Sequence, residues 1–421
     1  MRPLNLRNPA VIGLALLGTT PAIILGVLRL ADAGNVSDGT ASILYGVSIL
    51  SAAFLLTWAA EAAEHDISHA LALSSIAVIT VLPEYAVDFT LVWKAGDDPQ
   101  YAQYAVANMT GANRLLIGLA WPLVVLIIWA KHKRRGVRLA RSQNVELGFL
   151  AAATIYAFTL PLKGHIDLFD AVVFIGLFVG YMWFNARSEV REPDLIGPSA
   201  LIGALGTAQR RAVVLVLFVF AAAVIFLSAE PFAEGLIATG KTMGFDEFLL
   251  IQWVAPLASE APEILVASIF AFRGDGASAL GMLISAKVNQ WTLLIGSLPV
   301  VYAISTSSLS SLPLDGRQTE EVLLTAAQSL FAVAILVTLF LSARVSLVLL
   351  VMFLTQLFVP ETTFRLAFSG LYLAVAAAFL VGNRERLRSM VRLPRSTLQA
   401  GGLLGGLPDS DETDQEPETV P

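Results

Sequence analysis

Two pairs of carboxylates interrupt segments of this chain that are otherwise apolar. Glu84 directly follows a proline, and Asp88 lies one helical turn further along. In the second half of the chain Glu263 also follows a proline, and Glu260 lies one turn before it. Residues three or four positions apart share one face of a helix, so each pair presents two carboxylates in the same direction. Such an arrangement can hold a cation or exchange protons.

Oxygen atoms of other kinds accompany both pairs. The prolines before Glu84 and Glu263 lack an amide hydrogen and clash with the carbonyl four residues earlier, which frees one main-chain carbonyl in each segment. A freed carbonyl in an apolar medium is costly unless something binds it. The nearby hydroxyl and amide side chains are Thr80, Ser259, Ser285, Asn108, Asn113, Asn289 and Gln290. Hard cations such as Ca²⁺ and Na⁺ take oxygen ligands of these types, so the sequence predicts a cation site.

The composition places this site in a membrane. The chain is 56% hydrophobic and only 14% charged, and many apolar runs approach the ~20 residues needed to cross a bilayer. We predict spans near 10–30, 41–63, 67–93, 101–130, 145–162, 166–185, 211–239, 245–272, 277–304, 319–341, 344–359 and 362–382. Cysteine is absent, which excludes disulfides and thiolate metal sites. The fold class predicted is therefore an all-α polytopic membrane protein.

The distribution of basic residues gives the expected orientation. If both termini are cytoplasmic, that side collects most of the lysines and arginines, including the run KHKRRGVRLAR at 131–141, as expected for cytoplasmic loops. We interpret this run as a topogenic loop, with a nucleic-acid or lipid-binding patch as the alternative. The expected location is the cell membrane, and the expected partners are the lipid bilayer and transported cations, without nucleic acid. The oligomeric state is left open.

The two carboxylate pairs belong to a repeat. Each Pro-Glu element is followed by a further span with small and amide residues, VANMTGANRLL at 106–116 and GMLISAKVNQW at 281–291. The elements lie in the third and eighth spans, so the two copies cross the membrane in opposite directions, as in inverted-repeat transporters. The predicted units are an anchor helix (1–40), a first repeat (41–185), a cytoplasmic linker (186–210), a second repeat (211–360), a C-terminal helix (361–393) and a disordered acidic tail (394–421).

These motifs resemble a known family. TVLPE (80–84) with GAN (111–113), and SEAPE (259–263) with SAK (285–287), are similar to the two alpha-repeats of the sodium/calcium exchanger, or cation/Ca²⁺ antiporter, superfamily. The resemblance implies two inverted repeats of five helices, with one additional helix at each end of this chain. It also implies that Glu84 and Glu263 bind the transported cations. Their supporting ligands would be Thr80, Ser259, Asn113 and Ser285.

The chain also departs from the family pattern. Val81 and Glu260 replace hydroxyl residues of the Pro-Glu elements, and Ala112 and Ala286 replace small hydroxyl residues of the later elements. Lys287 stands where the second repeat should offer an oxygen ligand. We predict that Lys287 pairs with Glu260 and substitutes for one bound ion. The alternative is that the lysine snorkels along its own helix and does not reach the site.

The predicted function is secondary active antiport, exchanging Ca²⁺ or Na⁺ against Na⁺ or H⁺ by alternating access at a site near the bilayer midplane. A monovalent cation/H⁺ antiporter is the alternative within this class, and a cation channel is a further one. We expect no cofactor and no enzymatic activity, because motifs of intramembrane hydrolases such as HExxH and GxSxG are absent. His65 and His69 are spaced to hold a metal, but we interpret them as part of a solvated helix junction.

Overall fold

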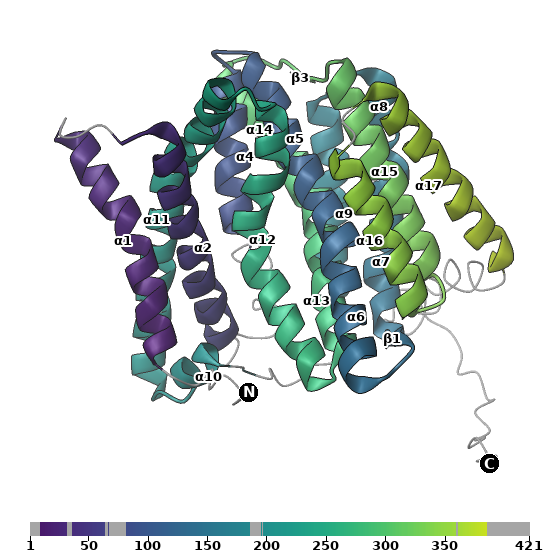
Figure 1. The fold of residues 1–421 in the computed structure, drawn as a ribbon, viewed down its shortest axis with the longest axis horizontal. Coiled ribbons are helices and arrows are strands. Elements are labelled where there is room, and N and C mark those ends of the chain that lie inside the picture. Colours follow the sequence, from purple (N-terminus) through teal and green to yellow (C-terminus); the bar gives the residue numbers. More distant parts are fainter. Residues whose placement is uncertain are drawn as a thin grey trace, which may run out of the picture.

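The computed structural model describes residues 9–31, 36–63, 66, 81–185, 195, 197–358 and 361–384, and these are almost entirely helical (Figure 1). The elements of the first half are α1 (Ala10–Leu30), α2 (Asp38–Ala63), α4 (Leu82–Ala95), α5 (Gln100–Leu115), η1 (Leu116–Ala120), α6 (Trp121–His132), β1 (Gly136–Arg138), η2 (Arg141–Gln143), α7 (Asn144–Ala157), α8 (Thr159–Lys163), β2 (His165–Ile166) and α9 (Leu168–Asn185). Those of the second half are α10 (Pro198–Gly203), α11 (Thr207–Met243), α12 (Glu247–Arg273), α13 (Gly276–Asn289), η3 (Gln290–Leu294), α14 (Ile295–Ser305), β3 (Leu312–Pro313), α15 (Gly316–Leu336), β4 (Phe340–Ser342), α16 (Ala343–Phe358) and α17 (Thr362–Gly382).

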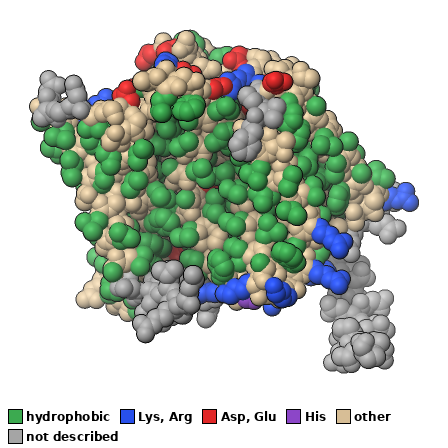
Figure 2. All heavy atoms as spheres, in the orientation of Figure 1, with side chains coloured by type: hydrophobic (Ala, Val, Ile, Leu, Met, Phe, Trp, Pro, Cys, Tyr) green, Lys and Arg blue, Asp and Glu red, His purple; other side chains and the backbone are tan. Residues whose placement is uncertain are grey.

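The helices form a layer suited to a membrane. Nine helices of the described ranges are long and apolar enough to span a bilayer. Figure 2 shows hydrophobic side chains across the middle of one face, with acidic side chains mainly along the upper rim and basic ones mainly along the lower rim. The basic run at 131–141 lies at the end of α12, where Lys131 and Arg134 donate hydrogen bonds to main-chain carbonyls of residues 272 and 274. The all-α polytopic membrane fold predicted from the sequence is confirmed.

The two halves repeat the same succession of elements. A π-helical segment, η1, continues α5, and another, η3, continues α13. η1 begins three residues after Asn113, and η3 begins three residues after Lys287, so these two residues occupy equivalent positions. Sequence patterns did not predict these π-helical turns, which often mark functional sites in helices.

Two short antiparallel strand pairs join the repeats. β1 of the first half pairs with β4 of the second, and β2 pairs with β3. β1 lies at the lower rim of the molecule and β3 at the upper rim in Figure 1. Each strand follows a helix of the layer in the chain, and each pair takes one strand from each repeat. Loops of the two halves are therefore linked on both sides of the helical layer.

Several boundaries differ from the sequence prediction. The described part of the third span is α4, which begins at Leu82. Thr80, His65, His69, the carbonyl freed by Pro83 and the tail at 394–421 lie outside the described residues. A short helix, α10, occupies part of the predicted linker and packs on α2. Nearby, Arg210 donates hydrogen bonds to Asp66 just beyond α2, and this interaction lowers the pKa of Asp66 to about 2.

A close approach of α5 and α12 brings the helices of the two repeats together. A Cβ atom at Gly111 would lie 1.8 Å from the main-chain oxygen of Gln252, so any larger residue must push the helices apart. We expect Gly111→Ala to destabilise the protein by ~1–3 kcal/mol, the usual cost of overpacking a core, and to slow transport. The measurement is thermal unfolding in detergent, followed by flux in liposomes.

Gly148→Ala is the matched control for this substitution. Gly148 lies in α7, and a Cβ atom there would have no neighbour within 4 Å. It should leave the unfolding temperature unchanged or slightly raised, since alanine favours helix over glycine. Equal unfolding temperatures of the two variants would contradict the inferred constraint at Gly111.

Candidate cation site

The four predicted carboxylates are all buried on α4 and α12. Their exposed fractions are 1% for Glu84, 0% for Asp88, 2% for Glu260 and 8% for Glu263. Glu84 lies in the first turn of α4, and α12 continues without a break through both of its prolines. Burying an ionised carboxylate is expensive unless it is paired, hydrogen-bonded or bound to a metal.

Most oxygen atoms of these carboxylates have no hydrogen-bond partner among the described residues. The atoms concerned are Glu84 Oε1 and Oε2, Asp88 Oδ2, Glu260 Oε2 and Glu263 Oε2. Buried polar atoms are nearly always satisfied in proteins, so an exception indicates strain or a missing ligand. Five such oxygen atoms on two neighbouring helices indicate a site for cations or protons.

Two of the carboxyl groups approach each other across the repeat boundary. Glu84 and Glu260 lie close enough for one to donate a hydrogen bond to the other when a proton is present. The other contacts hold the acids in place. Asn108 Nδ2 donates to Asp88 Oδ1 at 2.9 Å, and Gln290 Nε2 donates to Glu260 Oε1 at 2.6 Å. The geometry therefore combines carboxylates of both repeats in one buried cluster.

Lys287 lies in the same region but has a different partner from the one predicted. Its Nζ atom donates to Asn113 Oδ1 at 2.5 Å and lies 4.2 Å from the centre of the Trp291 ring. Glu260 accepts from Gln290 instead, so the predicted pair between Lys287 and Glu260 is wrong for this structure. The snorkelling alternative is also wrong, because Lys287 is fully buried.

The two described hydroxyl groups predicted as ligands also form hydrogen bonds within the protein. Ser259 Oγ donates to the carbonyls of Ala255 and Pro256 on its own helix, at 3.4 and 3.3 Å. Ser285 Oγ accepts from Tyr181 on α9 at 3.1 Å. No three acidic or histidine side chains in the described ranges converge closely enough to enclose a metal ion. A cation would therefore need amide or carbonyl oxygens in addition to the carboxylates.

Two residues near the site were not singled out from the sequence. Tyr85 donates its hydroxyl hydrogen to Asn289 Oδ1 at 3.1 Å, which links α4 to the end of α13. Trp291 covers the ammonium group of Lys287. The i,i+4 spacing of Lys287 and Trp291 could have indicated this contact. No sequence pattern identifies the long-range partner of Tyr85.

Other charged residues in the helices form separate ion pairs. Arg114 lies next to Asn113 in the chain but pairs with Glu321 of α15 at 2.6 Å. Lys94, at the end of α4, contacts Glu234 and also Glu230 of α11, the latter at 2.8 Å. These residues therefore have structural partners away from the four carboxylates.

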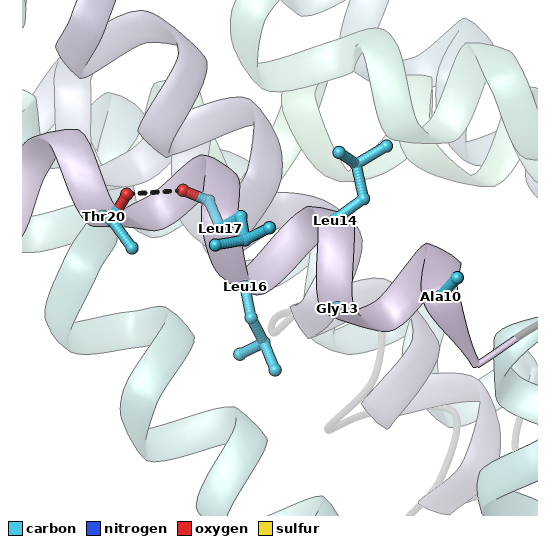
Figure 3. Close-up of a pocket in the computed structure, with 6 residues that line it drawn as sticks. All are labelled: Ala10, Gly13, Leu14, Leu16, Leu17 and Thr20. Atoms are coloured by element: carbon cyan, nitrogen blue, oxygen red, sulfur yellow. Dashed lines mark hydrogen bonds between the residues drawn. The ribbon is translucent and has the colours of Figure 1, made fainter.

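A surface hollow on α1 is unrelated to this site. Ala10, Gly13, Leu14, Leu16, Leu17 and Thr20 line it. Figure 3 shows that all six come from one helix and that Thr20 bonds the carbonyl of Leu17. The exposed apolar side chains are those of a lipid-facing helix.

Known structures share this architecture. The crystal structure of the H⁺/Ca²⁺ exchanger CAX is 44% identical, with a TM-score of 0.86, and the match covers 92% of this chain and 99% of that one. The Ca²⁺/H⁺ antiporter protein YfkE is 16% identical with a TM-score of 0.60, covering 83% of this chain and 99% of that one. The sodium-calcium exchanger NCX_Mj is 17% identical with a TM-score of 0.50, covering 76% and 97%. These last two likenesses concern the fold alone.

A family model agrees with these structural matches. The model described as "Sodium/calcium exchanger protein" matches residues 39–187 and again residues 213–380. No curated protein matches the chain. The two matched segments contain the two Pro-Glu elements and most of the described helices. The chain therefore belongs to the sodium/calcium exchanger family, whose members are cation antiporters of the cation/Ca²⁺ exchanger superfamily.

Proposed function

We propose that this protein exchanges Ca²⁺ for protons by alternating access at the buried carboxylate cluster. The observation that carries the proposal is the excess of buried acids. Glu84, Asp88, Glu260 and Glu263 are all buried, and their free oxygen atoms have no other partner among the described residues. Lys287 is the one buried lysine among the residues that the structure describes. Four ionised acids beside one ammonium group cannot remain uncompensated in a low-dielectric interior.

A divalent cation and protons can compensate this charge in turn. Ca²⁺ binds carboxylate and carbonyl oxygens and supplies two positive charges. When it leaves, protons must neutralise the same carboxylates, and the approach of Glu84 to Glu260 allows one proton to be shared. The similarity to the H⁺/Ca²⁺ exchanger CAX supports this choice of ions.

The distribution of charged side chains indicates how the protein is oriented in the membrane (Figure 2). The basic side chains along one rim favour a cytoplasmic position for that side. We propose that both termini are cytoplasmic and that the protein acts in the cell membrane. Glu84 and Glu263 would be the principal cation ligands, assisted by Asp88, Glu260 and the hydroxyl oxygen of Thr80. Ser259 donates its hydroxyl hydrogen to its own helix and so keeps its oxygen lone pairs for a cation, whereas Ser285 already accepts one hydrogen bond from Tyr181.

Flux measurements test the proposed ion pair. We expect proteoliposomes to accumulate Ca²⁺ when an opposing proton gradient is imposed, with gradients of Ca²⁺, Na⁺, K⁺ and H⁺ varied one at a time. The rate should change from mildly acidic to mildly alkaline pH, because protons and Ca²⁺ compete for the same carboxylates. Liposomes without protein are the control. A pH-independent rate, or proton-coupled flux of Na⁺ or K⁺ without Ca²⁺, would contradict the proposal.

A further inference from the structure

The ammonium group of Lys287 takes up oxygen atoms that a small cation would use. Nζ lies 2.5 Å from Asn113 Oδ1 and 3.4 Å from the main-chain oxygen of the same residue. Both are neutral oxygen ligands of the type that Na⁺ accepts. The group thus binds two neutral oxygens of one residue, as a small cation could.

The internal repeat relates Lys287 to a residue that can bind a cation. Lys287 and Asn113 are equivalent residues, each three positions before a π-helical segment. One repeat therefore provides an amide oxygen at this place, and the other provides a positive charge that binds that oxygen. If both repeats carried an amide, two oxygen ligands would face each other here without a charge between them.

Neighbouring groups hold the ammonium in place. The Trp291 ring lies on one side at 4.2 Å, a distance suited to a cation–π interaction. Asn113 Nδ2 donates to the carbonyl of Met109 at 2.8 Å, which fixes the orientation of the amide oxygen toward Lys287. Lys287 and Asn113 are both fully buried. A dissolved cation could bind these oxygens only by displacing a tethered one.

We propose that Lys287 is a built-in monovalent cation that prevents Na⁺ from binding at Asn113 and so from driving transport. The inference rests on the proposed exchange of Ca²⁺ for protons, because it assigns the residue that restricts the counter-ion to H⁺. Lys287 is then a specificity-determining residue and not a ligand of the transported ion.

Substitutions at Lys287 test the proposal through Na⁺ binding. We expect Lys287→Asn to bind Na⁺, because it places a second amide oxygen opposite Asn113 and removes the competing charge. Na⁺ should then raise the thermal unfolding temperature of the variant in detergent, with choline as the replacement cation, since a ligand that binds only the folded state stabilises it. The wild type and Lys287→Arg, which keeps the charge, should show no such shift.

Transport provides the second readout. An opposing Na⁺ gradient should change Ca²⁺ flux by roughly tenfold in Lys287→Asn, a typical coupling between two ligands, and should leave flux through the wild type and Lys287→Arg unchanged. Lys287→Gln, which also supplies an amide oxygen, is the second variant if Lys287→Asn folds poorly.

The outcomes separate this inference from the proposed function. Failure of proton-driven Ca²⁺ flux in the wild type would overturn the proposed function, whereas the Na⁺ thermal shift does not depend on it. A Na⁺ response already present in the wild type would overturn the inference. Folded Lys287→Asn and Lys287→Gln proteins that respond to Na⁺ in neither assay would also overturn it.

Discussion

Replacing Glu84 or Glu263 by glutamine should abolish Ca²⁺ flux while the protein remains folded. Glu84 has both carboxylate oxygens buried without a hydrogen-bond partner among the described residues, and Glu263 has one. Glutamine keeps the size of the side chain but removes its charge and replaces one oxygen by a hydrogen-bond donor. We expect a loss of at least about a hundredfold, because even residues that only orient a metal ligand are worth roughly ten- to a hundredfold in affinity.

Unfolding temperatures and a control variant distinguish a loss of transport from a loss of folding. Each variant should unfold at or above the wild-type temperature, since removing a buried uncompensated charge relieves a desolvation cost. Glu361→Gln is the control, because Glu361 is exposed at the start of α17 and its side chain makes no capping hydrogen bond. It should transport like the wild type. Wild-type flux in Glu84→Gln or Glu263→Gln would remove the carboxylate cluster as the transport site.

The second large effect concerns the stability of the helical layer. Arg114 and Glu321 are 2% and 3% exposed in their side chains and lie 2.6 Å apart. The guanidinium group also lies 4.9 Å from the ring centre of Trp253 on α12 and bonds Gln356 of α16. Arg114→Met should therefore destabilise the protein by about 3 kcal/mol, the lower end of the cost of breaking a buried ion pair. Of its described ion-pair partners, Glu321 would keep only Arg365, whose Nη1 atom lies 3.5 Å from Oε1. Thermal unfolding in detergent would measure the loss.

A double variant identifies the cause of this loss. Arg114→Met combined with Glu321→Leu should recover most of the stability, because a buried ion pair can often be replaced by apolar residues at little cost. Arg211→Met is the control, since Arg211 is 63% exposed beside Asp66 and an exposed pair contributes only ~0–1 kcal/mol. If the double variant is as unstable as the single one, packing of the arginine and not its charge explains the effect.

The sequence was informative where function depends on local patterns. The Pro-Glu elements, their second acids and the apolar spans are all visible within short windows, and hydrophobic length alone identifies most of the membrane helices. The four acids were therefore predicted together. The family resemblance required only the order of two short motifs in each half of the chain.

The features that sequence patterns did not predict depend on contacts between different helices. The spacing of Lys287 and Glu260 along the sequence could not show which side chains meet, and the lysine instead binds Asn113, a residue of the other repeat. The partner of Arg114 lies on α15, again far along the chain. The π-helical segments depend on packing of the whole bundle, since their residues have no propensity that distinguishes them from α-helix. Helix periodicity gives the face of a residue but not its neighbour.

The two strand pairs restrict how this molecule can change conformation. β1–β4 and β2–β3 act as noncovalent cross-links between the repeats, one at each rim of the layer. The elements that they join cannot swing apart as two separate halves without breaking main-chain hydrogen bonds. α1, α2 and α11 pack on one another, and none of them adjoins a strand in the chain. A displacement of these three helices relative to the rest would break no strand hydrogen bond, whereas it would break the ion pairs of Lys94, at the end of α4, with Glu230 and Glu234 of α11.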